Sequence, residues 1–68
     1  MKNCIKELRK RKKITQEELA EVTGVTRQTI NAIEQWKYSP SLELAFSISK
    51  FFKRRIGEIF EYSESKQN

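Results

Sequence analysis

The stretch 15–34 contains two helix starts separated by a single glycine, and this arrangement leaves the chain few ways to fold. Thr15 is followed three residues later by Glu18, the spacing of a capping box, in which both side chains bind free backbone N–H groups. Thr26 begins a second helical run, where its hydroxyl can also accept from a free backbone N–H. Gly24 can adopt the left-handed conformation that ends a helix and reverses the chain. The spacing therefore predicts two short helices that meet at a steep angle, a helix-turn-helix.

The order of apolar and polar residues in this stretch agrees with two packed helices. The residues that fall on the inner faces are Leu19, Ala20, Val25, Ile30 and Ile33. Long or amide side chains remain outside on the second helix, at Arg27, Gln28 and Asn31. Such side chains can form paired hydrogen bonds with guanine or adenine edges in the major groove of DNA. The second helix is therefore a candidate for reading DNA bases.

These positions, and others along nearly the whole chain, resemble the phage-repressor-like helix-turn-helix family, also called the Cro/CI or xenobiotic-response-element type. The similarity is strongest to its short stand-alone bacterial and archaeal members. The residues that carry the resemblance are Leu8-Arg9, Ile14-Thr15-Gln16-Glu17-Glu18-Leu19-Ala20, Gly24-Val25, Arg27-Gln28-Thr29-Ile30, Ile33-Glu34, Lys37-Tyr38-Ser39-Pro40-Ser41-Leu42 and Ile59-Phe60. The resemblance implies an all-α fold, a compact five-helix bundle of the lambda-repressor type, and a transcriptional regulator that binds double-stranded DNA sequence-specifically.

The length of 68 residues allows one domain. We expect a DNA-binding domain over residues 1–62 and a polar, disordered tail over residues 63–68. The net charge of +5 favours a polyanionic partner. A chain of this size buries only about 60% of its unfolded surface, so burial against a second copy would add stability. We therefore expect a homodimer.

The residue types that the chain lacks exclude several function classes. With no histidine and only Cys4 as a cysteine, we expect no metal site, no cofactor and no disulfide within the chain. Without a glycine-rich phosphate loop or paired carboxylates, we expect neither an enzyme nor a small-molecule ligand. No apolar run approaches the roughly 20 residues of a membrane-spanning helix. We expect a cytoplasmic protein of the bacterial or archaeal nucleoid, without membrane contact.

Capping residues and apolar spacing predict three further helices, over residues 4–12, 42–52 and 56–60. Asn3 is the expected cap of the first, and Ser39 or Ser41 that of the second.

The basic run over residues 10–13 and the two ends of the chain allow further predictions. Lys10, Arg11, Lys12 and Lys13 complement the dipole at the end of the first helix, and the same cations can attract phosphates. The resemblance adds a possible strand pairing between residues 1–3 and 60–62.

The helix over residues 42–52 has more apolar residues than one core face requires. One stripe at helical spacing comprises Leu42, Ala45, Ile48 and Phe52. Leu44, Phe46 and Phe51 are additional, so either the helix is deeply embedded or the surplus faces another subunit, which we favour for at least one of them. The residues expected at a dimer interface are Phe46, Phe51, Phe60 and Tyr62.

We expect the helix-turn-helix and the loop after it to divide the DNA contacts. The start of the second helix reaches base edges in this docking mode, and the expected base contacts are Arg27, Gln28, Thr29 and Asn31. Ala32 also faces outward but offers only a methyl group. Phosphate contacts are expected from Gln16, Thr26, Lys37 and Tyr38, and for Gln16 and the loop the resemblance implies them.

The resemblance also implies an ion pair between Arg9 and Glu34, which joins the helix over residues 4–12 to the end of the second helix of the motif. A partly buried pair of this kind fixes the angle between helices more than it adds stability. We therefore expect Arg9 to be architectural.

The chain departs from the family pattern at two places. Trp36 stands where relatives often have glycine or asparagine as a left-handed helix cap, so the helix ends differently or the indole packs across the loop or against the sugar-phosphate edge. Lys53-Arg54-Arg55 replaces a turn, a core residue and a cap. We consider three alternatives for these cations: they loosen the last helix, they add a basic patch, or they form a solvated charge run. We favour the solvated charge run.

The leading interpretation is a homodimeric repressor that reads a roughly palindromic operator with its third helix. Two copies of this helix would enter successive major grooves about 34–36 Å apart. An alternative is an antitoxin or protein-binding module that uses the helix-turn-helix only for autoregulation. A third is a nucleic-acid binder without sequence preference.

Overall fold

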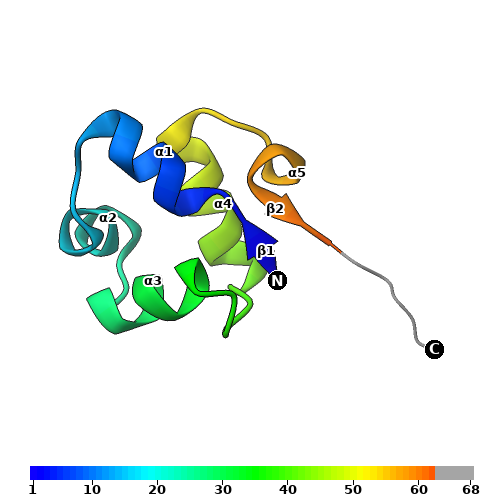
Figure 1. Cartoon of the computed structure of the whole chain (residues 1–68), viewed down its shortest axis with the longest axis horizontal. Coiled ribbons are helices and arrows are strands. Elements are labelled where there is room, and N and C mark those ends of the chain that lie inside the picture. Colours follow the sequence, from blue (N-terminus) through cyan, green and yellow to red (C-terminus); the bar gives the residue numbers. More distant parts are fainter. Residues whose placement is uncertain (63–68) are drawn as a thin grey trace.

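The elements follow one another as the sequence predicts, with five helices in the described part of the chain. The computed structural model describes residues 1–62, and its elements in order are β1 (Lys2–Asn3), α1 (Ile5–Lys12), α2 (Gln16–Thr23), α3 (Arg27–Glu34), α4 (Leu42–Phe52), α5 (Ile56–Ile59) and β2 (Phe60–Glu61). The helices surround one centre, with α3 along one side and the paired strands beside the end of α3 (Figure 1). The predicted five-helix bundle is confirmed. The tail expected over residues 63–68 lies outside the described residues.

The helix-turn-helix forms through the caps that its sequence predicts. Thr15 Oγ1 accepts a hydrogen bond from the Glu18 backbone N–H at 3.0 Å, and Glu18 Oε1 accepts one from the Thr15 N–H at 2.8 Å. At the start of α3, Thr26 Oγ1 accepts from the Thr29 N–H at 3.2 Å. Gly24 ends α2 with a φ of 76°, the left-handed conformation that a glycine adopts without strain. Both predicted helix starts and the turn between them are confirmed.

The first helix begins one residue later than predicted, because Cys4 belongs to the end of the strand pairing. The Cys4 N–H donates to the Ile59 carbonyl at 3.0 Å, and its φ and ψ of −117° and 29° are not helical. Asn3 still caps the helix, since its Oδ1 accepts from the Ile5 N–H at 3.1 Å. Asn3 lies opposite Phe60 in the antiparallel pair. The strand pairing that the resemblance suggested is therefore present.

The last two helices begin as predicted, at Leu42 and Ile56, but α5 is one residue shorter than expected. Ser41, rather than Ser39, caps α4, because its Oγ accepts from the Leu44 N–H at 3.1 Å. The α5 helix ends at Ile59, since Phe60 is extended and enters β2.

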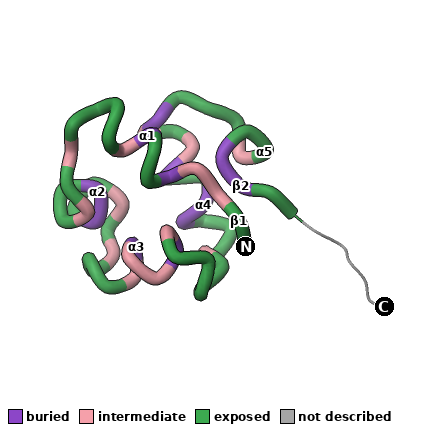
Figure 2. The backbone as a smooth tube through the Cα atoms, viewed as in Figure 1, coloured by how far each residue is buried: buried purple, intermediate pink, exposed green. Residues whose placement is uncertain are grey.

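The core lies at the centre of the bundle, where each helix turns its apolar face inward (Figure 2). Leu44, not Leu42, belongs to the core stripe of α4, and the expectation for Leu42 was wrong. Leu42 is 69% exposed because, at 100° per residue, it lies about 200° around the helix from Leu44. The buried residues are Ile5, Leu8, Leu19, Ala20, Ile30, Ile33, Leu44, Ala45, Ile48, Phe52, Ile59 and Phe60. Val25, predicted inside, is only half-buried against this cluster.

The four aromatic residues expected at a dimer interface differ in exposure. Phe46 is 57% exposed and Tyr62 is also exposed. Phe51 is half-buried, makes a T-shaped contact with the Phe52 ring, and lies under the Lys12 ammonium group. Phe60 is buried in the core of its own monomer, so little of its surface is left for a second copy. The accessible apolar surface of α4 is therefore formed by Leu42 and Phe46, one turn apart.

Three residues other than glycine adopt positive φ within residues 1–62: Lys13 at 60°, Trp36 at 66° and Lys53 at 57°. Lys13 and Lys53 end α1 and α4, and Lys53 makes the turn for which the family resemblance implies glycine. The left-handed conformation costs a residue with a Cβ about 1–2 kcal/mol.

The charge run that follows α4 is exposed at all three of its positions, Lys53, Arg54 and Arg55. The Glu58 carboxylate accepts from the Arg55 N–H at 2.9 Å, and Arg55 makes no side-chain cap of the serine type. The α5 helix is thus formed despite the charge run, and the loosened fifth helix is not observed. Within the described residues, no helix has the length and apolar character needed to cross a membrane.

Candidate nucleic-acid interface

The helix α3 presents one face to the core and another to the outside of the molecule. Ile30 and Ile33 are buried, whereas Arg27 and Gln28 are exposed at the helix start. A shallow surface groove runs along the outer face and is lined by Thr26, Gln28, Thr29, Ala32 and Tyr38. The structure therefore brings three of the expected base-reading or phosphate-binding residues of α3 together with Tyr38 of the following loop.

The ion pair between Arg9 and Glu34 is present and mostly buried, which confirms that prediction. Arg9 Nε lies 2.7 Å from Glu34 Oε2, and Arg9 Nη2 donates to Glu34 Oε1 at 3.2 Å. The side chains are 13% and 3% exposed, respectively. Arg9 Nη1 also donates to the Ile14 carbonyl at 3.0 Å. A two-pronged contact of this kind holds α1 and the end of α3 in one relative orientation.

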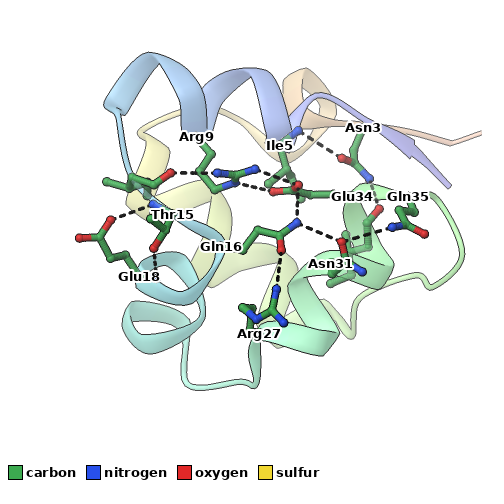
Figure 3. A network of polar contacts seen from close by, with 12 residues as sticks. Asn3, Ile5, Arg9, Thr15, Gln16, Glu18, Arg27, Asn31, Glu34 and Gln35 are labelled. Atoms are coloured by element: carbon green, nitrogen blue, oxygen red, sulfur yellow. Dashed lines mark hydrogen bonds and ion pairs between the residues drawn. The ribbon is translucent and has the colours of Figure 1, made fainter.

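Gln16, the first residue of α2, joins this ion pair to the outward face of α3 (Figure 3). Its Nε2 donates to Glu34 Oε1 at 3.0 Å and to Asn31 Oδ1 at 3.1 Å. Its Oε1 lies 3.5 Å from Arg27 Nη1, a long hydrogen bond. Gln35 Nε2 donates to the same Asn31 oxygen at 3.3 Å. One amide therefore connects three residues of α3 that are spaced one turn apart.

A second, open groove lies between the end of α1 and the start of α2. Its cationic lining comes from Arg9, Lys10, Lys13 and Arg27, and Glu17 is the acidic residue beside them. The first backbone N–H groups of α2 have no carbonyl partner within the helix, and the positive end of the helix dipole points the same way. An anion such as a DNA phosphate fits this combination. Gln16 also lines the groove, so the expected phosphate-binding residue lies where an anion would be held.

Comparison with known proteins matches the arrangement of these helices to one family. The family model described as Helix-turn-helix covers residues 5–59. The chain belongs to this helix-turn-helix family. The resemblance to its Cro/CI type, inferred from the sequence, is thereby confirmed.

Relatives from archaea and bacteria match almost the entire chain of this helix-turn-helix protein. MJ0272 of Methanocaldococcus jannaschii, described as an HTH-type transcriptional regulator, is 53% identical over 97% of this chain and 100% of its own. An HTH-type transcriptional regulator of Archaeoglobus fulgidus is 46% identical over 97% of this chain and 93% of its own. YgzD of Bacillus subtilis, with the same description, is 50% identical over 94% of this chain and 97% of its own.

The loop after α3 contains one of the two departures from the family pattern, Trp36. Trp36 adopts the left-handed conformation that glycine or asparagine would supply, so the helix ends in the usual way despite the bulky residue. The Lys2 ammonium group lies 5.6 Å from the centre of the indole ring, and the N-terminal amine donates to the Trp36 carbonyl at 3.4 Å. The indole thus lies beside β1, where a cation–π contact offsets part of the backbone strain. Lys37 and Tyr38 follow with exposed side chains.

Sequence reasoning treated Gln16 and Asn31 as separate DNA contacts and did not predict that they contact each other. The spacing offered one signal, because Arg27, Asn31 and Glu34 recur at i, i+4 and i+7 and so share a helix face. The sequence gives no signal for a role of Gln35. Lys10 and Lys13 are compatible with both the α1 dipole and phosphate attraction, and the structure places them beside the start of α2.

Proposed function

We propose that this protein is a transcriptional regulator that binds double-stranded DNA sequence-specifically, with α3 in the major groove. The single observation that carries the proposal is the juxtaposition of the outward face of α3 with the cationic groove at the start of α2. A helix start in the major groove needs both base-reading side chains and an anchor for the adjacent phosphates. Membership of the helix-turn-helix family, whose relatives are described as transcriptional regulators, supports the same function.

The residues divide into base-reading and phosphate-binding groups in this proposal. Arg27 and Gln28, which are exposed, and the half-buried Thr29 reach base edges from the first turn of α3, and Asn31 contacts DNA from the next turn. The phosphate-binding group consists of Gln16, Thr26, Lys37 and Tyr38, to which the cationic groove adds Lys10 and Lys13. Gln16 contributes its backbone N–H at the start of α2, because both ends of its side-chain amide already bind Glu34, Asn31 and Arg27. Ala32 offers the surface of its methyl group alone.

The protein acts, in our proposal, as a homodimeric repressor on a roughly palindromic operator. Leu42 and Phe46 support a dimer, because they are exposed apolar side chains one turn apart on α4. Tyr62 and the accessible edge of Phe51 can extend such an interface. Two copies would place their α3 helices about 34–36 Å apart, in successive major grooves. Occupancy of a promoter by this dimer would block transcription.

The same exposed apolar pair also favours a second candidate, an antitoxin or other protein-binding module. In that case Leu42 and Phe46 hold a different protein, and the helix-turn-helix serves autoregulation. The mass of the purified protein in solution distinguishes the two. A stable dimer that is lost in Phe46→Ser supports the repressor, whereas a monomer that gains mass only with a co-purified protein supports the module.

Selection of bound genomic fragments, followed by sequencing, tests the proposed function directly. We expect a recurrent half-site in inverted repeat, whose spacing gives the dimer geometry. Competition with random duplex at physiological salt is the control. If random duplex competes as well as the selected fragments, the protein binds nucleic acid without reading sequence and the proposal is wrong.

A further inference from the structure

We infer that Asn31 contacts DNA only as a hydrogen-bond donor, and that its partner on the duplex is a hydrogen-bond acceptor, presented by a base edge or by a phosphate. The inference rests on the proposed function and specifies the chemistry of one of its contacts. It follows from the chain of hydrogen bonds that leads from Arg9 through Glu34 and Gln16 to Asn31. The residue types determine which group donates in each of these bonds.

The direction is set at Arg9, because a guanidinium group can only donate hydrogen bonds. Glu34, its partner, receives hydrogen bonds on both carboxylate oxygens. An ionised carboxylate can only accept, so the group of Gln16 that lies 3.0 Å from Glu34 Oε1 must be the Nε2 amide. The other end of Gln16 faces Arg27, again a donor, which requires the Oε1 oxygen there. Both ends of the Gln16 amide are therefore assigned by chemistry.

The orientation of Gln16 determines that of Asn31. Gln16 Nε2 can only donate, so the Asn31 atom 3.1 Å away must be the carbonyl oxygen Oδ1. That oxygen has two lone pairs, and Gln35 Nε2 at 3.3 Å takes the second. The Asn31 Nδ2 group points away from Gln16 and makes no hydrogen bond with any residue of the described chain (Figure 3).

An asparagine that reads adenine uses both ends of its amide, accepting from N6 and donating to N7. Asn31 cannot do this while its oxygen is held by Gln16 and Gln35. What remains is a pair of N–H donors, which match guanine N7 and O6, thymine O4 or a phosphate oxygen. Gln35 is a positioning residue in this scheme, because it acts on DNA through the orientation of Asn31.

The polar network can be tested in the free protein, independently of any DNA. We expect the side-chain amide protons of Gln16 to exchange with water at least ten times more slowly than those of the exposed Gln28, measured by nuclear magnetic resonance. Equal exchange rates would mean that Gln16 is not held by Glu34 and Asn31, and the inference would be overturned.

The DNA partner is identified with the variant Asn31→Ala and the selected operator. If the acceptor is on a base, N31A loses preference at one base pair. Replacing the acceptor there, with 7-deazaguanine or with a thymine analogue that lacks O4, weakens the wild-type protein about tenfold and N31A hardly at all. If the acceptor is a phosphate, N31A weakens binding to every sequence equally, and one neutral methylphosphonate reproduces this loss in the wild type alone.

Two results would overturn the inference. One is unchanged binding and preference in N31A. The other is an adenine whose 6-amino group, when removed, weakens the wild type but not N31A, since that group can only donate to Oδ1. Failure of the proposed function looks different, because the wild-type protein would then select no sequence while the slow exchange of Gln16 could still be observed. If the acceptor is on a base, the variant Gln35→Ala should tolerate adenine at that base pair, because it frees one lone pair of Asn31 Oδ1. The control is Lys50→Ala, an exposed change on α4.

Discussion

The Asn3 side-chain nitrogen donates a 2.8 Å hydrogen bond to the carbonyl of Ile33, and so ties the first strand to the last turn of α3. The same amide serves two other groups, because its nitrogen donates to the Met1 carbonyl and its oxygen accepts from the Ile5 N–H. One side chain therefore adds a second hydrogen bond to the Ile33 carbonyl, which also accepts from the Trp36 N–H, and satisfies the Ile5 N–H at the start of α1.

Asn3→Ala should lower the free energy of unfolding by about 1–3 kcal/mol, because it leaves the Ile5 N–H without a partner and removes the bond between the first strand and Ile33. In a domain of this size, each kcal/mol corresponds to a decrease of about 4–8 °C in melting temperature. Thermal unfolding followed by circular dichroism measures this decrease in melting temperature. Lys6→Ala, an exposed change on α1, is the control. An unchanged melting temperature in N3A would show that water replaces all three contacts.

Glu34→Ala should destabilise the fold by about 3–5 kcal/mol, since it leaves Arg9 buried without its counter-charge. Glu34→Gln keeps the shape of the side chain and should cost less. Chemical denaturation of both variants checks this order. We expect the base pairs read by Arg27 and Gln28 to stay the same in selection experiments. Lost preference at those pairs without loss of stability would contradict an architectural role.

The two glycines of the chain should respond in opposite ways to alanine. Gly24→Ala should destabilise by about 1–2 kcal/mol, because its φ of 76° is strained for a residue with a Cβ. Gly57→Ala should stabilise by about 0.5–1 kcal/mol, because Gly57 lies within α5. A Cβ added at either position meets no atom within 4 Å, so the difference isolates the backbone. Equal melting temperatures would disprove this account.

Substitution by glycine should stabilise the fold more at Lys53 than at Trp36, although both residues have positive φ. Lys53→Gly removes the backbone strain from an exposed side chain and should stabilise by about 0.5–1 kcal/mol. Trp36→Gly removes the same strain but also the contact with Lys2, which offsets about 0.5–1 kcal/mol. Thermal unfolding of the two variants makes the comparison. An equal gain at both positions would mean that the indole contributes nothing to stability.

Lys10→Ala combined with Lys13→Gln should weaken binding to all duplexes alike. Each lysine that contacts a phosphate should reduce the slope of log K against log salt by about 1. Titrations at several salt concentrations give this slope. Arg54→Gln is the matched control, because the loop between α4 and α5 lies on the opposite side of the molecule from α3 (Figure 1). A reduced slope in R54Q instead would identify the charge run after α4 as a DNA contact.

The local sequence predicts most of the fold because each helix start carries its own cap. Thr15, Thr26 and Ser41 bind N–H groups only a few residues away, so no knowledge of the distant chain is needed. Lys13 and Lys53 end their helices in a conformation that lysine rarely adopts. The residue type therefore gives no local signal of it, although the Ile14 and Arg54 N–H groups close both helix ends by donating to the Arg9 and Ser49 carbonyls.

The candidate site could be predicted residue by residue, but not as a network. Arg27 and Gln28 follow from their place at the start of α3. The bonds from Gln16 to Asn31 and Glu34 depend on the angle at which α2 packs on α3, which the periodicity of one helix does not contain. The exposure of Leu42 was missed for a related reason, since several apolar stripes fit α4.

The strand pairing has a consequence for the order in which the molecule folds. Lys2 lies opposite Glu61, so the pair closes a loop that spans nearly all of the described chain. Closing so long a loop is entropically less favourable than forming the turn between α2 and α3. The helix-turn-helix can therefore assemble first, and the chain ends join last. The contact of Asn3 with the far end of α3 consequently forms after the helix-turn-helix and is lost before it.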